Sequence, residues 1–343
     1  MPVNSHYLPQ FLLKGFSFRQ SGGEFYVHIY RRGCLPFSSN AKGIGAEGDF
    51  YGSDAIEQTL SDAETQFASL VRQLREGDCE PSNKPLIDRF VAHSLIRTKC
   101  FRTGVHNIGA SVLREGFREF LDPEYTPQLL AKLVEDVMLE PEVRIFLAAA
   151  PTYVRPLLEE LMRKMLLHPD MHGKLRQMIV PTLNTIDTAT SVQAAQRQIL
   201  ENHQHLEKRV RDLSEITWHL ETYKARSLIL GDIGPLVRGS EPKEWGRIFH
   251  GIPQSIWFPL SDRILLVGDS PYGTTRPDFE EVNVVSAENS VEFFVASQRT
   301  QREDQYQQRI SVQMDRITAG QLSELKQTIR EYLTTPGGAL TTE

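Results

Sequence analysis

The sequence has few cysteines and none of the short motifs that directly reveal an activity. Its three cysteines, Cys34, Cys79 and Cys100, are widely spaced and odd in number. This pattern fits reduced cytosolic thiols better than a disulfide framework or a zinc site, so we expect buried or inert thiols. The glycine-rich stretch 42–52 lacks the spacing of a Walker or dinucleotide-binding loop, and we interpret it as a structural turn. Composition and pattern alone therefore give no biochemical activity.

Long apolar runs and an excess of positive charge are also missing. No segment approaches the roughly 20 apolar residues that span a bilayer, and the N-terminus lacks the features of a secretory signal. The formal net charge of -6 gives no global attraction to nucleic acid, although a local basic cleft could still bind one. The sequence therefore predicts a soluble, cytoplasmic protein that does not enter a membrane.

Helical patterns dominate what is present. The chain has 343 residues, 40% of them hydrophobic, which is enough for one large domain or two modest ones. The clearest helix begins after Ser53 and carries an apolar stripe that includes Leu60 and Phe67. A second helix begins near Lys84. Residues 111–213 continue as helical segments that prolines interrupt, which indicates a helical bundle.

Strand patterns are confined to the two ends of the chain. Residues 25–30 alternate in polarity, and residues 225–232 and 261–268 are short apolar runs bounded by turn residues. Residues 255–260 could form a hairpin with the last of these runs. Residues 283–298 fit either type of element, and we predict a helix because apolar residues recur there at helical spacing.

These patterns predict an α+β fold that is predominantly α-helical. We expect a helical bundle packed on a small sheet that combines strands from near both ends of the chain. The predicted organisation is a single domain over residues 1–335, with a helical middle at about 84–215 and strand-containing parts at about 20–32 and 225–270. Residues 336–343 are expected to form a flexible tail.

An ordered set of short blocks carries a family resemblance. The blocks are His6-Tyr7-x-Pro9 with Phe11-Leu12 and Phe16, Ala46-Glu47-x-Asp49-Phe50-Tyr51, Glu57, Ile96-Arg97-Thr98 with Arg102, Trp218, Asp232 with Pro235, Phe258-Pro259-Leu260-Ser261, and Asn283. Over about residues 5–297 the chain resembles the domain-of-unknown-function family 4238 (DUF4238). The family usually has Asp-Asn-Pro where this chain has Asp232-Ile233-Gly234-Pro235. The resemblance implies an association with bacterial anti-phage defence and no particular mechanism.

Three polar residues in these blocks are the predicted catalytic groups. His6 could act as a general acid or base at neutral pH, or could cap a buried segment through hydrogen bonds. Arg97 could clamp a phosphate or carboxylate, could lie on a hydrated helix face, or could pair with a buried acid such as Asp49. Asp232 follows an apolar strand, from which its side chain could reach a cleft or cap a turn.

Other residues are candidates for binding. The predicted substrate-binding residues are Arg102, Tyr51 and Asn283. Asp49 and Glu57 are the predicted ligands of a divalent ion such as Mg²⁺, which prefers oxygen ligands. Glu57 could instead favour the positive end of its helix, and Glu64, two turns further on, has no partner that the sequence assigns.

Two functions follow from these residues. The first is an effector enzyme, a nuclease or nucleotide-processing hydrolase, that acts on phosphodiester or nucleotide substrates. The second is a non-catalytic interaction or sensor module that recognises a phage or host protein, with the same polar residues as buried hydrogen-bonding links. Both predict that His6, Asp49, Arg97 and Asp232 converge, in an open pocket for the enzyme and in a closed network for the module. The sequence indicates no oligomeric state.

Overall fold

The computed structural model describes residues 4–48, 54–97, most of 131–168, 203–224, 227–239, 245–246, 252–271 and 276–313, with a few single positions outside these ranges. The chain divides into two compact units. Unit 1 contains Met1–His106 and Ala189–Arg316, and unit 2 contains Asn107–Thr188 and Ile317–Glu343. The single domain expected over residues 1–335 stays a prediction, and the expected tail at 336–343 lies outside the described residues.

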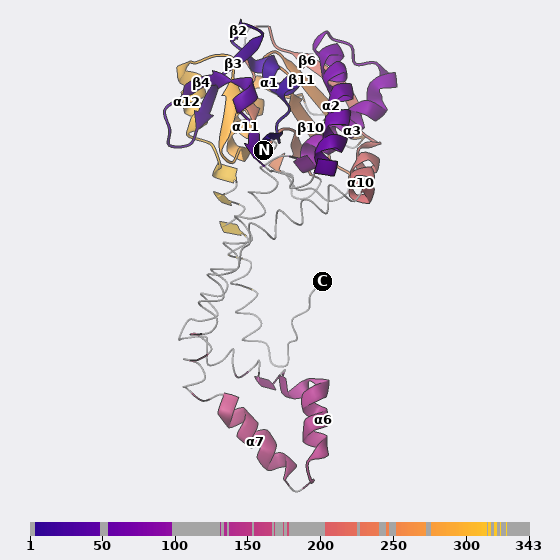
Figure 1. The fold of residues 1–343 in the computed structure, drawn as a ribbon, viewed down its shortest axis with the longest axis vertical. Helices are drawn as coiled ribbons and strands as arrows, with labels where there is room; N and C mark the ends of the chain where they lie inside the picture. The colour runs from indigo at the N-terminus through magenta and orange to yellow at the C-terminus, as the bar shows by residue number, and fades with distance from the viewer. Residues whose placement is uncertain are drawn as a thin grey trace. The chain divides into compact units, whose positions relative to one another are not determined.

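One sheet of unit 1 joins strands from distant parts of the chain (Figure 1). It has the order β2-β3-β12-β7, and β4 also pairs with β3. The strands are β2 (Arg19–Ser21), β3 (Glu24–Arg31), β4 (Phe37–Asn40), β7 (Leu230–Gly231) and β12 (Phe293–Ala296). Tyr30 lies opposite Phe294 in the antiparallel pair of β3 and β12, and their rings stack with centroids 4.8 Å apart. This contact holds two segments together that are far apart in the sequence.

The second sheet of unit 1 is built from residues 217–269 alone. Its order is β6-β11-β10-β8-β9, and all of its strand pairs are antiparallel. The strands are β6 (Thr217–Thr222), β8 (Leu236–Arg238), β9 (Trp245–Gly246), β10 (Ser255–Pro259) and β11 (Ile264–Asp269). The predicted hairpin is present as β10 and β11, with Trp257 opposite Val267.

Helices pack against both sheets of unit 1. The described helices of unit 1 include α1 (Gln10–Leu13), α2 (Asp54–Arg75), α3 (Lys84–Arg97), α10 (His203–Leu213), α11 (Phe279–Asn289) and α12 (Gln301–Gln307). Leu60 and Phe67 on the apolar stripe of α2 are buried, as predicted. Phe90 of α3 lies 5.4 Å from Phe67 and 5.2 Å from Phe258 of β10, measured between ring centroids. These rings therefore join α2, α3 and the second sheet in one core.

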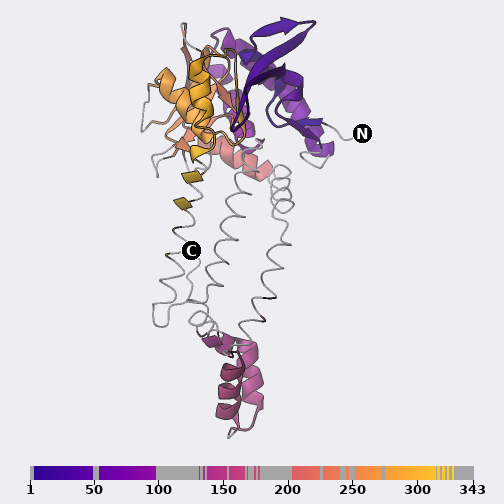
Figure 2. The same ribbon diagram turned by 90° about the vertical axis from the view of Figure 1, so that its left-hand side faces the viewer.

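A helical hairpin is the main described part of unit 2. It consists of α6 (Pro141–Ala149) and α7 (Arg155–Leu166), drawn in magenta in Figures 1 and 2. Leu147 of α6 is buried, and Leu158 and Met162 of α7 belong to the same small core. Arg155 donates hydrogen bonds from Nε to the carbonyl oxygen of Leu147 at 3.1 Å and from Nη2 to that of Ala148 at 3.1 Å. The start of α7 thus caps the end of α6.

The predicted predominantly helical fold is wrong. Two five-stranded antiparallel sheets make the protein a mixed α+β fold rather than a helical bundle on one small sheet. The pattern underestimated the sheets because strands as short as β8 and β9, of three and two residues, show no alternation, and because the fully buried β12 matches a helical spacing. In the expected helical middle, α3, α6, α7 and α10 are described, and most of the other residues are not.

Three local expectations also need correction. The helix predicted over residues 283–298 ends at Asn289 in α11, and β12 follows, because Phe293–Ala296 are buried strand residues that matched a helical period by chance. Within the described part of this run, residues 227–232, the strand is limited to Leu230–Gly231. Cys34 and Cys79 are free as expected; Cys34 is exposed, so the expectation of a buried or inert thiol is narrowed to an inert one there, and Cys100 lies outside the described residues.

Candidate functional site

The N-terminal block, from His6 to Phe16, is held in place in part by main-chain hydrogen bonds. β1 (Asn4–His6) pairs antiparallel with β5 (Ala46–Gly48), and His6 lies opposite Ala46. The carbonyl oxygen of Gly45 then accepts hydrogen bonds from the amides of Tyr7 at 2.7 Å and Leu8 at 3.1 Å. Gly45 has a φ of 64°, and a Cβ atom there would lie 2.7 Å from Cβ of Leu8. The glycine-rich connection is therefore a turn that the N-terminal segment packs against.

Arg97, the last residue of α3, holds this segment from the side. Its Nε donates to the carbonyl oxygen of His6 at 3.0 Å, and its Nη2 donates to the same oxygen and to Oε1 of Glu64 on α2. The Arg97 side chain is 6% exposed, whereas that of Glu64 is 32% exposed. Because a buried guanidinium is stable only when its charge and its donors are satisfied, these bonds define the role of Arg97 in the fold.

Arg75, at the end of α2, holds the next part of the segment. Its Nη2 donates to the carbonyl oxygens of Phe11 at 2.9 Å and Leu12 at 3.1 Å, and its Nε donates to that of Leu260 at 2.9 Å. Burial lowers the pKa of Arg75 to about 10, and the charge of Asp262 opposes this shift. Two buried arginines therefore fasten the N-terminal block through main-chain oxygens.

The imidazole of His6 is half-buried. Its Nε2 lies 2.8 Å from Nε2 of Gln10, the first residue of α1. A bond between these atoms requires a neutral imidazole that accepts from the amide, or an amide turned so that its oxygen accepts from the ring. Gln10 thus orients the ring, and the Arg97 bonds fix the main chain beneath it.

Tyr7 connects His6 with the third predicted catalytic residue. Its side chain is buried, and burial raises the pKa of Tyr7 well above its ordinary value. The nearby carboxylates of Asp232, Glu292 and Glu47 raise the pKa further, against the opposing charge of Arg31. Tyr7 therefore stays a neutral phenol throughout the physiological pH range.

Asp232 is committed to the main chain. It is 1% exposed, and its carboxylate accepts hydrogen bonds from the amides of Val291 at 2.8 Å, Glu292 at 2.7 Å and Phe293 at 3.3 Å. These amides form the connection between α11 and β12. An aspartate that accepts several amide bonds caps a turn, which is the second of the two roles that the sequence left open.

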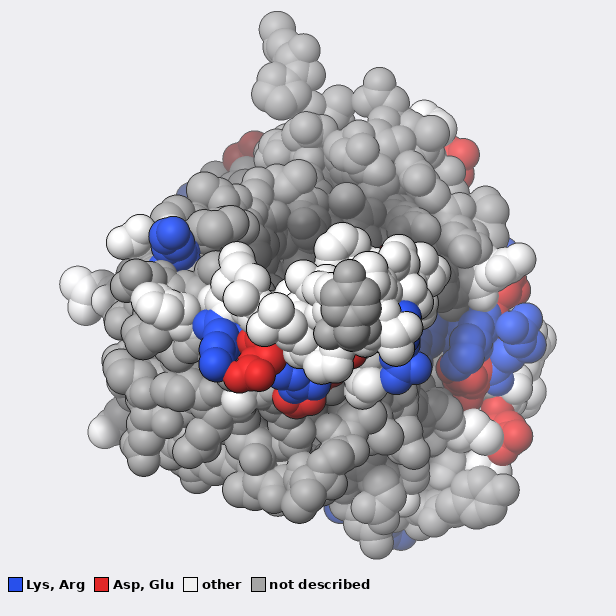
Figure 3. Space-filling view, turned by 90° about the horizontal axis from the view of Figure 1, so that it is seen from below, with Lys and Arg blue, Asp and Glu red and all other residues white. Residues whose placement is uncertain are grey.

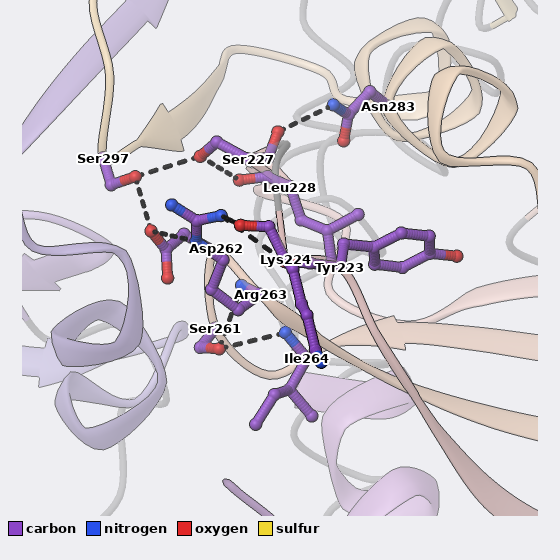
Figure 4. A network of polar contacts seen from close by, with 10 residues as sticks. All are labelled: Tyr223, Lys224, Ser227, Leu228, Ser261, Asp262, Arg263, Ile264, Asn283 and Ser297. Carbon is purple, nitrogen blue, oxygen red and sulfur yellow. Dashed lines mark hydrogen bonds and ion pairs between the residues drawn. The ribbon is translucent and has the colours of Figure 1, made fainter.

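Asn283 lies in a different part of unit 1, shown in Figure 4. It is fully buried on α11; its Oδ1 accepts from the amide of Ile229 at 3.0 Å, and its Nδ2 donates to the carbonyl oxygen of Ser227 at 3.0 Å. The hydroxyls of Ser227 and Ser297 are 2.9 Å apart, and Ser297 donates to Asp262 at 2.9 Å. This chain of polar groups connects α11 with the turn between β10 and β11.

The structure brings only some of the predicted site residues together. Arg97 contacts His6, and Asp232 acts on Tyr7, the next residue. Asp49, Tyr51 and Arg102 lie outside the described residues, and Glu57 is on α2 with a side chain that is not described. Among the described residues, no group of His, Cys, Asp and Glu side chains could hold a metal ion. The predicted metal ligands therefore stay predictions.

The contacts of Arg97 and Arg75 with the N-terminal block form a clamp, and the sequence does not predict its other members. It assigns no partner to Glu64 and does not identify Gln10 or Arg75 as site residues. The one usable signal was that Glu64 belongs to a long amphipathic helix with an acidic residue beside its apolar stripe. Its partner Arg97 is 33 positions away, so no local spacing could identify the pair.

A second polar group, on the second sheet, was also not predicted. His219 of β6 has Nδ1 3.9 Å from Oδ2 of Asp269 and Nε2 3.8 Å from Oε1 of Glu221. Ser255 donates to Asp269 at 3.3 Å from the neighbouring strand. The His219 side chain is 43% exposed, so it can contact a solute, and the adjacent carboxylates could orient its ring. The pairing of β6 with β11 brings Asp269 to His219, which no local spacing indicates, whereas Glu221 is two residues from His219 and shares its face of β6.

The comparisons with known proteins identify a family. A family described as "Protein of unknown function (DUF4238)" matches residues 4–304. No curated protein and no solved structure matches the chain. Within the part of the chain that the structure describes, none of the helices combines the length and apolar character needed to cross a membrane.

Proposed function

The chain belongs to the DUF4238 family of proteins of unknown function, and from this membership and the clamp around the N-terminal block we propose that it is a non-catalytic interaction or sensor module in bacterial anti-phage defence. Its partner in this proposal is a phage or host protein, and its location is the cytoplasm. The defence role is supported by the association that the family resemblance implies. The two free cysteines among the described residues support the location.

One observation carries the non-catalytic part of the proposal. The polar groups of Arg97 and Asp232 are buried, and they are hydrogen-bonded to main-chain atoms of His6 and of residues 291–293. A catalytic group must reach a substrate, whereas these groups hold one segment of the chain against another. The arrangement supports a closed network.

The second candidate function is a nuclease or nucleotide-processing hydrolase. It is favoured by His219, which is exposed and lies beside Asp269 and Glu221. An exposed histidine with an adjacent carboxylate can serve as a general base for the attack of water on a phosphodiester. In this alternative, nucleic acid or a nucleotide is the substrate, and His219 takes the role that the sequence assigned to His6.

Phage protection measured at equal folded abundance separates the two functions. The variants are His6→Ala, Arg97→Ala and His219→Ala, with Arg89→Ala as the matched control, because Arg89 lies on the same helix as Arg97 in an exposed pair with Glu207. Efficiency of plating is compared with the amount of folded protein. We expect protection per folded molecule in each of the four variants to equal that of the wild type.

Three outcomes would contradict the proposal. A His219→Ala variant with an unchanged melting temperature and no protection would favour the hydrolase, and hydrolysis of single-stranded DNA, RNA or a nucleotide by the purified wild type would strengthen that conclusion. A stable His6→Ala variant that gives no phage protection would support a catalytic role for the N-terminal block. A wild-type protein that protects against none of a broad panel of phages would overturn the defence role.

A further inference from the structure

The hairpin of unit 2 exposes an unusual amount of apolar surface. Ten large hydrophobic side chains are exposed among the described residues, and seven of them lie between Val137 and Met165. The exposed side chains of the hairpin itself include Ile145 at 71%, Phe146 at 61% and Leu157 at 64%. Single exposed apolar residues are common, but a cluster of this kind marks a contact surface.

On α7 the exposed apolar residues form a stripe. Leu157, Leu161 and Met165 are spaced four residues apart and are 64%, 52% and 60% exposed. This spacing places them on one face of the helix, away from Leu158 and Met162, which pack toward α6. The helix therefore has one apolar side in the hairpin core and another that faces outward.

The charged residues beside this stripe could pair with the same residues in a second copy of the helix. Glu160 and Lys164 pair across one turn at 2.8 Å, with side chains 63% and 75% exposed. If two copies of α7 lie antiparallel about a two-fold axis that crosses the outward face at the height of residue 162, Glu160 of each copy faces Lys164 of the other. Figure 3 shows uncharged surface on this hairpin with Lys or Arg and Asp or Glu side chains next to one another along it.

We propose that the outward face of α7, with Leu157, Leu161 and Met165 at its centre, is the contact surface between two copies of this chain. A second copy fits better than an anionic membrane, because Glu160 neutralises Lys164 beside the stripe, so this pair adds no net attraction to anionic lipid. It also fits better than a partner of one charge sign, because the face presents both signs. The proposal holds whether or not the protein is an enzyme.

The oligomeric state of the full chain tests this surface. Light scattering after size exclusion should report about twice the 39.0 kDa of one chain. The Leu157→Glu/Leu161→Glu double variant should weaken the dimer at least about ten-fold, because it buries acidic groups in the contact. Leu35→Glu is the control, since Leu35 is 88% exposed and lies in unit 1, and it should remain dimeric.

A charge exchange identifies the geometry of the contact. Glu160→Lys and Lys164→Glu should each weaken the dimer, since each places like charges across the two-fold axis, and the double exchange should restore it. Circular dichroism melts check that all variants fold. A monomeric wild type at micromolar concentration, or glutamate variants that fold and remain dimeric, would overturn the proposal. Binding of the monomer to vesicles of anionic lipid would assign the face to a membrane instead.

Discussion

Arg97 and Arg75 show how single residues determine the character of the N-terminal block. Both are arginines at the C-terminal ends of helices, and the sequence predicts anion binding for Arg97 only. In the structure they donate to the carbonyl oxygens of His6, Phe11 and Leu12. A guanidinium can bind several main-chain oxygens at once, because its donors form a rigid planar fork. The two residues therefore act as clamps.

Replacing Arg97 tests the clamp directly. We expect Arg97→Ala to lower the free energy of unfolding by about 1–3 kcal/mol, because it leaves the carbonyl oxygen of His6 and the partly exposed carboxylate of Glu64 without this donor. Arg89→Ala removes an exposed pair with Glu207 and should change it by less than about 0.5 kcal/mol. Urea unfolding gives both values. Equal effects of the two substitutions would show that Arg97 holds nothing in place.

The raised pKa of Tyr7 predicts that the protein loses stability at alkaline pH. Its pKa is raised in the folded protein by burial and by Asp232, so the unfolded chain loses the phenolic proton first, at about pH 10. The stability that this tyrosine contributes is complete below that pH and is lost as the pH rises above it. Urea unfolding between about pH 9 and 11 should therefore show a shallower decline in Tyr7→Phe than in the wild type. Parallel declines would indicate that Tyr7 ionises normally in the folded state.

At the scale of elements, the turn before β5 decides where the N-terminal segment lies. Gly45 permits a left-handed backbone and the close approach of Leu8, and its carbonyl oxygen accepts two amides from the segment. α1 and the Arg75 contacts follow directly along the chain. A change at this position therefore acts directly on Tyr7 and Leu8.

The close approach at Gly45 can be separated from its backbone conformation. Gly45→Ala and Gly33→Ala both place a side chain at positive φ, which costs about 1–2 kcal/mol of strain. Only at Gly45 does the new Cβ meet another atom, since nothing lies within 4 Å of it at Gly33. We expect Gly45→Ala to lower the free energy of unfolding by about 1–3 kcal/mol more than Gly33→Ala. Equal values would mean that Leu8 moves away without loss.

At the scale of the whole molecule, the described parts have separate cores. The cluster that includes Phe67, Phe90 and Phe258 lies in unit 1, and the cluster of Val134, Met138 and Leu147 lies in unit 2. All three tryptophans of the chain, Trp218, Trp245 and Trp257, are in unit 1. Tryptophan fluorescence therefore reports on the unfolding of unit 1.

This placement allows a test of whether the units unfold separately. Leu147→Ala creates a cavity in the hairpin core and should destabilise unit 2 by about 2–5 kcal/mol. We expect the far-ultraviolet circular dichroism melt to shift while the midpoint of the tryptophan fluorescence melt stays unchanged. A common shift of both signals would show that the two units unfold as one cooperative structure.

The sequence by itself determined the elements whose signals are local. The stripe of Leu60 and Phe67 indicated α2, and the apolar runs on either side of the turn at residues 260–263 indicated the β10–β11 hairpin. Helical periodicity and hairpin turns depend on residues within a few positions of one another. The sequence predicts helix instead of β12 because Phe294 and Val295 continue the helical spacing of the apolar residues before them.

Only the tertiary structure decided what the polar residues do. Arg97 bonds to a residue 91 positions away, and Asp232 bonds to amides about 60 positions away. The sequence indicated that these residues would converge, because a polar group among apolar neighbours needs a partner. Whether that partner is a main-chain atom or a ligand depends on how β1, α3 and the α11–β12 connection meet in space. Because those distant segments pack together, Arg97 binds the main chain of His6 and Asp232 binds the amides of residues 291–293.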